Sequence, residues 1–275
     1  MNNFEGKTAL VTGAASGIGR GLCEELCAQG AVVCAADVNE AGLQEFKNSM
    51  PANATIIPVR LDVSQETDFE QAIDTLLQGY GKLDLLVNNA GIVLGGDFSE
   101  TSNEELRKLF DINLWGVIYG TQQAYRVMIK QGHGHIVNVS SSAGSMPVPM
   151  STAYCASKHA IVGFSHSLRE EAALYGVKVS VVLPGMVKSG LWDAALNVKD
   201  YNYKVEMESM PLKQISPRQA GTAIVKGIAK NDRTIAFPLI NKIILRLYQL
   251  LPGIGTKLFV KSLVRPLADS LAKSK

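Results

Sequence analysis

The chain has 275 residues and a nearly balanced charge, with 27 Lys and Arg against 25 Asp and Glu. A hydrophobic fraction of 47%, with 25 glycines and 10 prolines, is typical of an ordinary globular α/β protein and excludes a disordered chain. No run approaches the roughly 18–20 apolar residues of a transmembrane helix, and the amino-terminal segment lacks a secretory signal pattern. We therefore expect a cytoplasmic protein of one domain, with a small-molecule substrate and no nucleic-acid partner.

Short apolar runs alternate with amphipathic runs along the chain. Strands are expected at residues 7–13, 31–37, 54–63, 82–91, 135–141 and 177–185. Helices are expected at residues 17–30, 41–50, 66–81, 103–132 and 152–175. Strands this apolar are buried on both faces, which predicts a parallel sheet with helices on each side. The expected fold is therefore a single-domain, doubly wound α/β sheet of the Rossmann type.

A glycine-rich loop, "TGAASGIG" (12–19), falls between the first predicted strand and the first predicted helix. Gly13 permits the tight turn, Gly17 lets the backbone approach a pyrophosphate, and Gly19 lets the helix pack closely on the strand. Such a loop alone is weak support for a nucleotide-binding site, because an ordinary turn between a strand and a helix can have a similar sequence. Its position nevertheless indicates a dinucleotide site.

Asp37 ends the second predicted strand, 18 residues after Gly19. A carboxylate at that place accepts hydrogen bonds from the ribose hydroxyls of an adenosine, whereas a 2′-phosphate would be repelled. The flanking Ala36 and Val38 supply no cation to neutralise a phosphate, although Arg20 lies beside the loop. The sequence therefore favours NAD over NADP as the cofactor.

The stretch "STAYCASKHA" (151–160) places Tyr154 and Lys158 four residues apart, so that they share one face of a helix. Oxidation of a secondary alcohol needs a base for the hydroxyl proton, and a tyrosine with a pKa near 10 is a poor base at neutral pH. An ammonium at ~4 Å would lower that pKa by about 3 units. The alternative is a surface pair without function, which the nearby nucleotide loop and serine-rich strand end make less attractive.

The four cysteines, Cys23, Cys27, Cys34 and Cys155, form no CxxC or Cys/His cluster. We interpret them as buried thiols and expect no metal site. His135 and His159 are interpreted as structural residues.

Six motifs occur in the order found in the short-chain dehydrogenase/reductase family, classical type, which the chain resembles over about residues 5–235. They are "TGAASGIG" (12–19), "NNAG" (88–91), "DINLWG" (111–116), "NVSSSAG" (138–144), "YCASK" (154–158) and "PGMVKSG" (184–190). The resemblance implies a nicotinamide-dependent oxidoreductase acting on a secondary alcohol or ketone. It leaves the substrate open, because the family acts on steroids, sugars, polyols, retinoids, fatty acyl groups and aromatic alcohols.

The resemblance also implies catalytic roles. Tyr154 would be the acid and base, and Lys158 would lower its pKa and bind the nicotinamide ribose. The family's serine stands three residues after an asparagine and about thirteen before the tyrosine, which selects Ser141, with Ser142 as the second choice. Asn113 would be the helix asparagine whose backbone holds a water in a proton relay ending at Lys158.

Further motifs imply contacts with the adenosine half of the cofactor. Residues 89–91 are expected beside the adenosine ribose. Asp62, together with Val63, is expected beside the adenine amine. The alternative for Asp62 is a solvated acid at a strand end.

The nicotinamide half would lie over the turn formed by Pro184 and Gly185. Ser189 stands where the family usually has a threonine contacting the carboxamide, and it keeps the hydroxyl. The expected cofactor-binding residues are Gly13, Ser16, Gly17, Ile18, Gly19, Asp37, Asp62, Val63, Asn89, Ala90, Gly91, Tyr154, Lys158, Pro184, Gly185, Val187 and Ser189.

The substrate side is expected to be apolar, with no cluster suited to a phosphate or carboxylate. Methionine and aromatic side chains supply adaptable apolar surface. The expected substrate-binding residues are Ser141, Met146, Val148, Tyr154, Met186, Leu191 and Trp192. They predict a fairly large apolar alcohol or ketone, resembling a steroid, a lipid or an aromatic compound. The alternative is that half of these side chains only pack the lid onto the core.

The last 37 residues are basic, with seven Lys and Arg against Asp269. We divide the chain into a catalytic domain, 1–238, and a basic amphipathic extension, 239–275. Such helices are typical of membrane surfaces, so that peripheral membrane contact through 239–265 is one expectation. Another is that the extension covers the substrate pocket or forms the interface of a homodimer or homotetramer; an acidic protein partner is the third.

The sequence as a whole predicts an NAD(P)-dependent dehydrogenase or carbonyl reductase. The alternative is a binding protein on the same fold that senses a nucleotide or is recruited to a membrane without catalysis.

Overall fold

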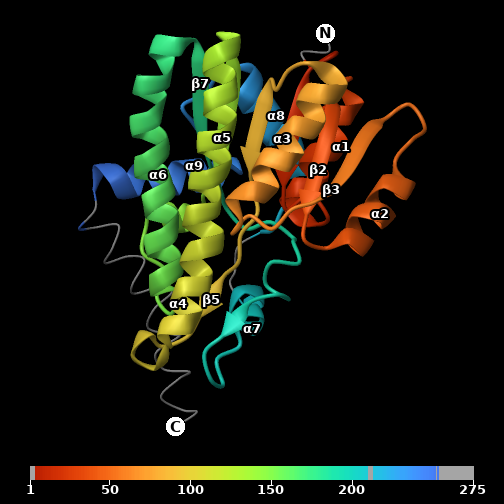
Figure 1. Ribbon diagram of the computed structural model, residues 1–275. Helices are drawn as coiled ribbons and strands as arrows, with labels where there is room; N and C mark the ends of the chain where they lie inside the picture. The colour runs from red at the N-terminus through yellow and green to blue at the C-terminus, as the bar shows by residue number, and fades with distance from the viewer. Residues whose placement is uncertain (1–3, 210–212, 252, 254–275) are drawn as a thin grey trace.

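The computed structural model describes residues 4–209, 213–251 and 253. Within them, a seven-stranded parallel sheet forms the centre of a single domain (Figure 1). Its strands, in spatial order, are β3 (Thr55–Arg60), β2 (Val32–Asp37), β1 (Thr8–Thr12), β4 (Leu85–Asn88), β6 (Gly134–Val139), β7 (Val177–Pro184) and β9 (Thr234–Phe237). The predicted doubly wound Rossmann-type fold is confirmed.

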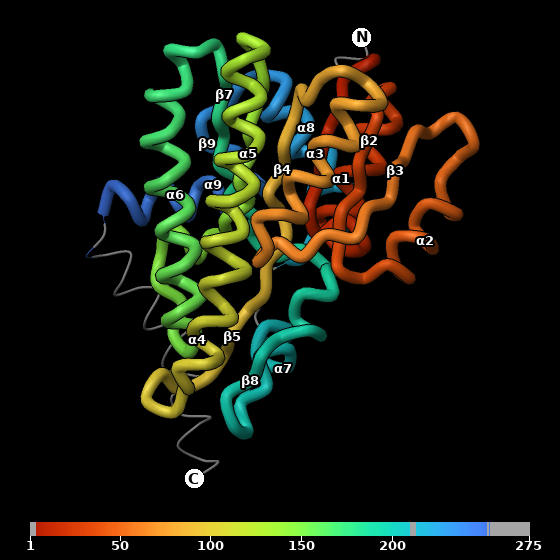
Figure 2. The backbone as a smooth tube through the Cα atoms, viewed as in Figure 1, coloured from red at the N-terminus to blue at the C-terminus, as the bar shows by residue number. Residues whose placement is uncertain are grey.

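The helices cover both faces of the sheet. They are α1 (Gly17–Ala28), α2 (Glu40–Ser49), α3 (Glu66–Tyr80), α4 (Asn103–Phe110), α5 (Gly116–Gln131), α6 (Thr152–Ala172), α7 (Tyr203–Ser209), α8 (Pro217–Ala229) and α9 (Leu239–Leu250). Helices α3, α5 and α6 lie in front of the sheet in Figure 2, with α1 and α8 behind it. A separate small sheet consists of two short parallel strands of two residues each, β5 (Leu94–Gly95) and β8 (Leu196–Asn197).

The strands are mostly apolar because side chains on both faces of the sheet meet a helix layer. In β1, Ala9 and Val11 belong to the core cluster shared with α1, α2 and α8, whereas Leu10 belongs to the cluster shared with α3 and α5. Successive side chains of a strand point to opposite faces, so that alternation distributes one run between two cores. This is the pattern expected of a parallel sheet.

The strand order reverses between β1 and β4, and the chain winds in opposite directions from these two strands. At such a switch point the loops after the strands separate and leave a crevice at their carboxyl ends. The loops after β1, β2, β4, β6 and β7 all open toward this edge. The fold therefore places the predicted motifs together.

Two regions differ from the sequence-based expectation. The helical stretch predicted over residues 103–132 forms α4 and α5, and these are joined by a π-helical turn, Asp111–Trp115, that was not predicted. Strand β9 and helices α7 and α8 were not among the predicted elements. Helix α8 begins with a capping box, in which the side chains of Ser216 and Gln219 each accept a hydrogen bond from the backbone N–H of the other residue. Pro217 follows at the first helical position.

The basic extension is only partly described, since residues 252 and 254–275 lie outside the described residues. Its first part forms α9, which follows β9 directly and runs behind α5 and α6 in Figure 1. Leu245 of α9 is buried in a core cluster with Ile161 and Leu183. Among the described residues, no helix combines the length and apolarity needed to cross a bilayer.

Candidate active site

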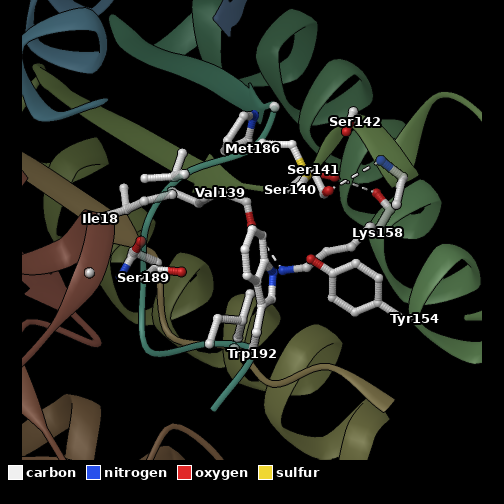
Figure 3. Close-up of a pocket in the computed structure, with 18 of the residues that line it drawn as sticks. Ile18, Val139, Ser140, Ser141, Ser142, Tyr154, Lys158, Met186, Ser189 and Trp192 are labelled. Atoms are coloured by element: carbon white, nitrogen blue, oxygen red, sulfur yellow. Dashed lines mark hydrogen bonds between the residues drawn. The ribbon is translucent and has the colours of Figure 1, made fainter. Parts of the chain in front are cut away.

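A cavity of about 810 Å³ lies at the carboxyl edge of the sheet. It is lined by every predicted site residue except Gly19 and Asn113, which lie behind its wall. Figure 3 shows Ile18 and Ser189 on one side of this cavity and Tyr154 and Lys158 on the other, with Trp192 between them. The structure thus brings the nucleotide loop and the tyrosine–lysine pair to one space.

The glycine loop is packed so tightly that side chains cannot be added. A Cβ at Gly13 would lie 2.8 Å from Nδ2 of Asn89, and one at Gly19 would lie 2.1 Å from the carbonyl oxygen of Gly13. Gly17 has φ +53°, and a Cβ there would lie 2.9 Å from Cβ of Ser189. The loop therefore keeps its backbone at the surface of the cavity.

Helix α1 begins at this loop without any local anion. Ser16 occupies the position before the helix but makes no side-chain capping hydrogen bond, and the first turn contains no acidic residue. The free N–H groups and the helix dipole favour a negatively charged group there. This arrangement fits a pyrophosphate.

Asp37 is held at the end of β2 by two backbone groups. The N–H of Ala15 donates to Oδ2 and the N–H of Asn39 donates to Oδ1, both at 3.0 Å. Arg20, the cation that could have served a 2′-phosphate, instead pairs with Glu45 at 3.1 Å. The carboxylate therefore faces the cavity without a described cation paired to it.

Asp62 and Val63 line the cavity next to Asp37, after β3. The N–H and hydroxyl of Ser64 both donate to Oδ1 of Asp62, at 3.0 and 2.7 Å. Val63 packs against the start of α5, where a Cβ at Gly116 would lie 2.8 Å from its Cβ. These contacts hold the acid at the wall of the cavity.

Asn89 closes the loop after β4 onto the glycine loop. Its Nδ2 donates to the carbonyl oxygens of Thr12 and Gly13, at 2.9 and 3.2 Å. Its own N–H and that of Ala90 donate to Oγ1 of Thr12, at 3.0 and 3.1 Å. Two loops that are far apart in sequence thus form one rigid wall.

Tyr154 and Lys158 are buried on the face of α6 that borders the cavity, with 7% and 4% of their surfaces exposed. Nζ of Lys158 lies 5.7 Å from the centre of the Tyr154 ring and donates to the carbonyl oxygen of Val139 at 3.2 Å. Burial lowers the pKa of Lys158 to about 8. A cation that titrates near neutrality therefore lies beside the phenol.

The pKa of Tyr154 is raised to about 12, chiefly because burial disfavours the phenolate, while a hydrogen bond with Ser141 opposes the rise. That Lys158 lowers this pKa in the working enzyme stays a prediction. Desolvation of the buried phenol is the larger effect. The phenol accordingly holds its proton at neutral pH.

The three consecutive serines after β6 have different surroundings. The Ser140 hydroxyl is buried and donates to the backbone oxygen of Lys158 at 2.7 Å, which fixes α6 against β6. Ser141 accepts from the N–H of Ala143 at 3.1 Å and hydrogen-bonds to the phenol of Tyr154. Ser142 also lines the cavity, but its described hydrogen bonds are made by its backbone. Of the three, Ser141 has the hydroxyl next to the phenol.

Asn113 lies in the π turn and is completely buried. Its Oδ1 accepts from the N–H of Ile92 and its Nδ2 donates to the carbonyl oxygen of Ile92, both at 2.8 Å. The same Nδ2 also donates to Oγ of Ser157 at 3.3 Å, so that both ends of the side chain are engaged. π turns inside helices are frequent at functional sites.

The side chains predicted to bind the substrate are mostly apolar. Met146, Val148, Met186, Leu191 and Trp192 all line the cavity. Side chains of α7 and α9 also line the cavity: they are Tyr203, Met207, Ile240, Asn241, Ile244, Leu247 and Tyr248.

Tyr203 was not predicted as a site residue. Its ring packs against Gly95, where a Cβ would lie 2.5 Å from Cδ2 of the ring, and this holds α7 over the cavity. Burial, followed by the nearby charge of Tyr154, raises its pKa above the ordinary range. The lid segment contains several aromatic residues, and the sequence offers no signal that singles out this one.

Helix α9 joins the cavity through Asn241. Its Nδ2 donates to the carbonyl oxygens of Leu183 and Phe237, at 3.0 and 3.3 Å. A Cβ at Gly185 would lie 3.2 Å from Cβ of Asn241, so that the helix sits directly on the turn after β7. The first part of the extension therefore lines the cavity.

The remaining titratable groups do not form a second centre. His135 is buried against Ser180, with Nε2 and Oγ 2.9 Å apart, and burial lowers its pKa to about 3. All four cysteines are free thiols whose pKa values are raised by burial. Among the described residues no cluster of three or more His, Cys, Asp or Glu could hold a metal ion.

Comparison with known proteins agrees with this geometry. Residues 7–199 match the family model described as short chain dehydrogenase. The putative oxidoreductase SadH of Mycobacterium tuberculosis is 34% identical over 87% of this chain and 88% of its own length. The 3-oxoacyl-[acyl-carrier-protein] reductase FabG of Escherichia coli is 36% identical over 69% of this chain and 77% of its own.

A solved structure gives the same result. A short chain dehydrogenase/reductase from Burkholderia phymatum, determined in complex with NAD, has a TM-score of 0.82 and 30% identity. The match covers 92% of this chain and 96% of that one. The relatives support NAD(P)-dependent oxidoreduction, and members of the family generally bind small molecules and form oligomers. The chain belongs to the short-chain dehydrogenase/reductase family.

Proposed function

We propose that this protein is an NAD-dependent enzyme that moves a hydride between nicotinamide and a fairly large, apolar secondary alcohol or ketone. The observation that carries the proposal is that Ser141 and the buried Tyr154 and Lys158 face the same cavity as the glycine loop. When bound, a nicotinamide cofactor accepts or supplies the hydride and, in its oxidised form, adds a positive charge. The acid–base work falls to this chain's own side chains.

In ketone reduction, Tyr154 donates its proton to the carbonyl oxygen. Its raised pKa of about 12 keeps the phenol protonated at neutral pH, so that the donor is ready before the reaction. Ser141 hydrogen-bonds the same oxygen, and Lys158 stabilises the phenolate that forms. In alcohol oxidation the same groups work in reverse, with phenolate as the base. The backbone of Asn113 is proposed to hold the water that returns the proton through Lys158.

The preference for NAD rests on Asp37. Its two oxygens are fixed by the backbone at the cavity wall, and Arg20 is engaged with Glu45. A 2′-phosphate at that place would meet the carboxylate with no described cation to offset it. Kinetics with both cofactors test this point: kcat/KM with NAD is expected to exceed that with NADP by at least about tenfold.

The substrate class follows from the cavity wall. The walls formed by Met146, Val148, Met186, Leu191 and Trp192 offer apolar contacts and no carboxylate. A substrate with a large apolar body gains from burial there, whereas a sugar or polyol would leave its hydroxyl groups unpaired. A panel of steroids, long-chain and aromatic secondary alcohols, compared with polyols, is the direct test. As family members generally form oligomers, we extend the proposal to a cytoplasmic homodimer or homotetramer.

The decisive experiment combines three variants. Tyr154→Phe is expected to abolish turnover while NAD still binds, because only the proton donor is lost. Ser141→Ala should reduce kcat by about 100-fold or more, whereas Ser142→Ala, the matched control one residue away, should stay near the wild type. Near-normal turnover of Tyr154→Phe would refute the mechanism. Tight NAD binding without turnover on the whole panel would instead favour a nucleotide-sensing protein.

A further inference from the structure

Helix α9 is apolar on two sides, and only one of them is packed. Asn241 and Leu245 are buried, and Ile244 and Tyr248 pack beside them. A second set, which we call the outer face, consists of Leu239, Ile240, Ile243, Leu247, Leu250 and Leu251, with exposures from 44% to 76%. At 100° per residue these six positions fall within an arc of about 120°. The outer face is therefore one continuous apolar stripe.

This stripe differs from the rest of the described surface. Of the thirteen large hydrophobic residues that are exposed among the described residues, six belong to the outer face and seven are distributed elsewhere. Single exposed hydrophobic residues are normal, but a contiguous group indicates an interaction surface. In Figure 2 the end of α9 extends past α6 at the edge of the molecule.

The charges beside the stripe indicate what it contacts. Lys242 and Arg246 lie on the third side of the helix, and neither forms an ion pair with any described residue. The sequence beyond position 251 adds five more Lys and Arg against Asp269 alone. A helix with an apolar face, a basic face and no acidic residue is suited to the interface of an anionic bilayer. A two-fold contact between copies would instead bring these cations toward one another.

We propose that the outer face of α9 docks this protein onto anionic membrane surfaces, with the helix lying in the plane of the lipid headgroups. Ile240 and Leu247 belong to both the outer face and the cavity wall. Docking therefore places one wall of the cavity against lipid. On the basis of the proposed function, an apolar substrate dissolved in the bilayer then has a short path to Tyr154.

The test uses the full-length protein without substrate, so that its failure is separate from a failure of the proposed reaction. Flotation with vesicles of phosphatidylcholine alone and of phosphatidylcholine mixed with phosphatidylglycerol measures binding. We expect binding to the anionic vesicles that falls with added salt, and little binding to the neutral ones. Equal binding to both, or binding to neither, would overturn the proposal.

Two sets of variants locate the contact. Ile243→Asp with Leu250→Asp is expected to weaken binding by at least roughly tenfold for each residue, because apolar burial is lost. Neither side chain lines the cavity. Leu174→Asp, which changes a residue that is 82% exposed elsewhere, is the matched control and should bind as the wild type does. Lys242→Gln and Arg246→Gln should each weaken binding roughly fivefold.

The same proteins are examined by light scattering and for NAD binding. Retained NAD binding shows that a variant is folded. An outer-face variant that binds vesicles as tightly as the wild type would overturn the assignment to α9. A wild type that ignores vesicles, together with an oligomer that dissociates when Ile243 and Leu250 become Asp, would assign the face to a second copy instead.

Discussion

Replacement of Lys158 by Met is expected to stabilise the protein at neutral pH while removing its activity. Lys158 is 4% exposed, and burial lowers its pKa from 10.5 to about 8. That fall corresponds to roughly 3 kcal/mol by which the folded state disfavours the ammonium. Loss of the hydrogen bond to the Val139 carbonyl oxygen, at 3.2 Å, removes about 1 kcal/mol. The net gain is about 2 kcal/mol, or about 5 °C in Tm.

The pH dependence of the difference identifies its cause. Because the folded-state pKa of Lys158 is depressed to about 8, the unfolded chain binds more protons between about pH 8 and 10.5. The free energy of unfolding of the wild type is therefore lowered by the full cost of the buried ammonium below pH 8, and it recovers as the pH rises toward 10.5. The Met variant lacks this contribution, so that its advantage should shrink as the pH rises and be gone by pH 10.

Urea unfolding of both proteins at pH 7 and pH 10, followed by circular dichroism, measures the two differences. Because other groups titrate equally in both proteins, the change in the difference reports Lys158 alone. A Met variant that is less stable than the wild type at pH 7 would refute the reasoning. So would an advantage that stays constant between the two pH values.

Three further predictions concern the nucleotide loop, the π turn and the core. Gly17→Ala should weaken NAD binding, measured by calorimetry, by at least about tenfold, since the φ of +53° strains any other residue by about 1–2 kcal/mol. Gly79→Ala changes a glycine in open space on α3 and should leave the NAD affinity unchanged. Asn113→Ala should lower the free energy of unfolding by about 3 kcal/mol, because both backbone groups of Ile92 lose their hydrogen-bond partner. Urea titrations measure this change, and a loss below about 1 kcal/mol would contradict the prediction. Burial lowers the pKa of His135 to about 3, so the free energy of unfolding of the wild type should fall by roughly 3 kcal/mol as the pH falls from 6.5 to 4. In the same titrations, His135→Gln should show a correspondingly smaller fall.

Much of the fold could be predicted because its signals are local. The glycines of the first loop, the buried strands and the helix periodicity each depend on nearby residues, and the crossover rule then orders them. Helices α7 and α8 and strand β9 were missed. Ser216 and Pro217 do carry a helix-start signal, but β9 is a four-residue strand whose pairing with β7 depends on distant residues. The π turn was missed because it is defined by one extra residue in an otherwise helical pattern.

The site followed the sequence closely where motifs are compact. The cavity includes all the predicted substrate residues and all but one of the predicted cofactor residues, and the exception, Gly19, packs behind the loop. The sequence did not show whether burial or the charge of Lys158 has the larger effect on the pKa of Tyr154. The spacing from Lys158 predicts attraction to phenolate, but the burial that raises its pKa arises from side chains of α7 and β5, which are remote in sequence. Tyr203 was missed for the same reason.

The π turn at 111–115 sets the rotational position of α5, because a π turn takes up one extra residue locally. If the same residues formed ordinary α-helix, α5 would be rotated by about 100° relative to α4. Gly116 and Gly120 would then leave their close contacts, and larger side chains would meet Val63 and its neighbours. The same change would move Asn113 away from the loop after β4. Substitutions can therefore accumulate along this helix over evolutionary time, whereas loss of the π turn at constant chain length would disrupt core packing and the active site at once.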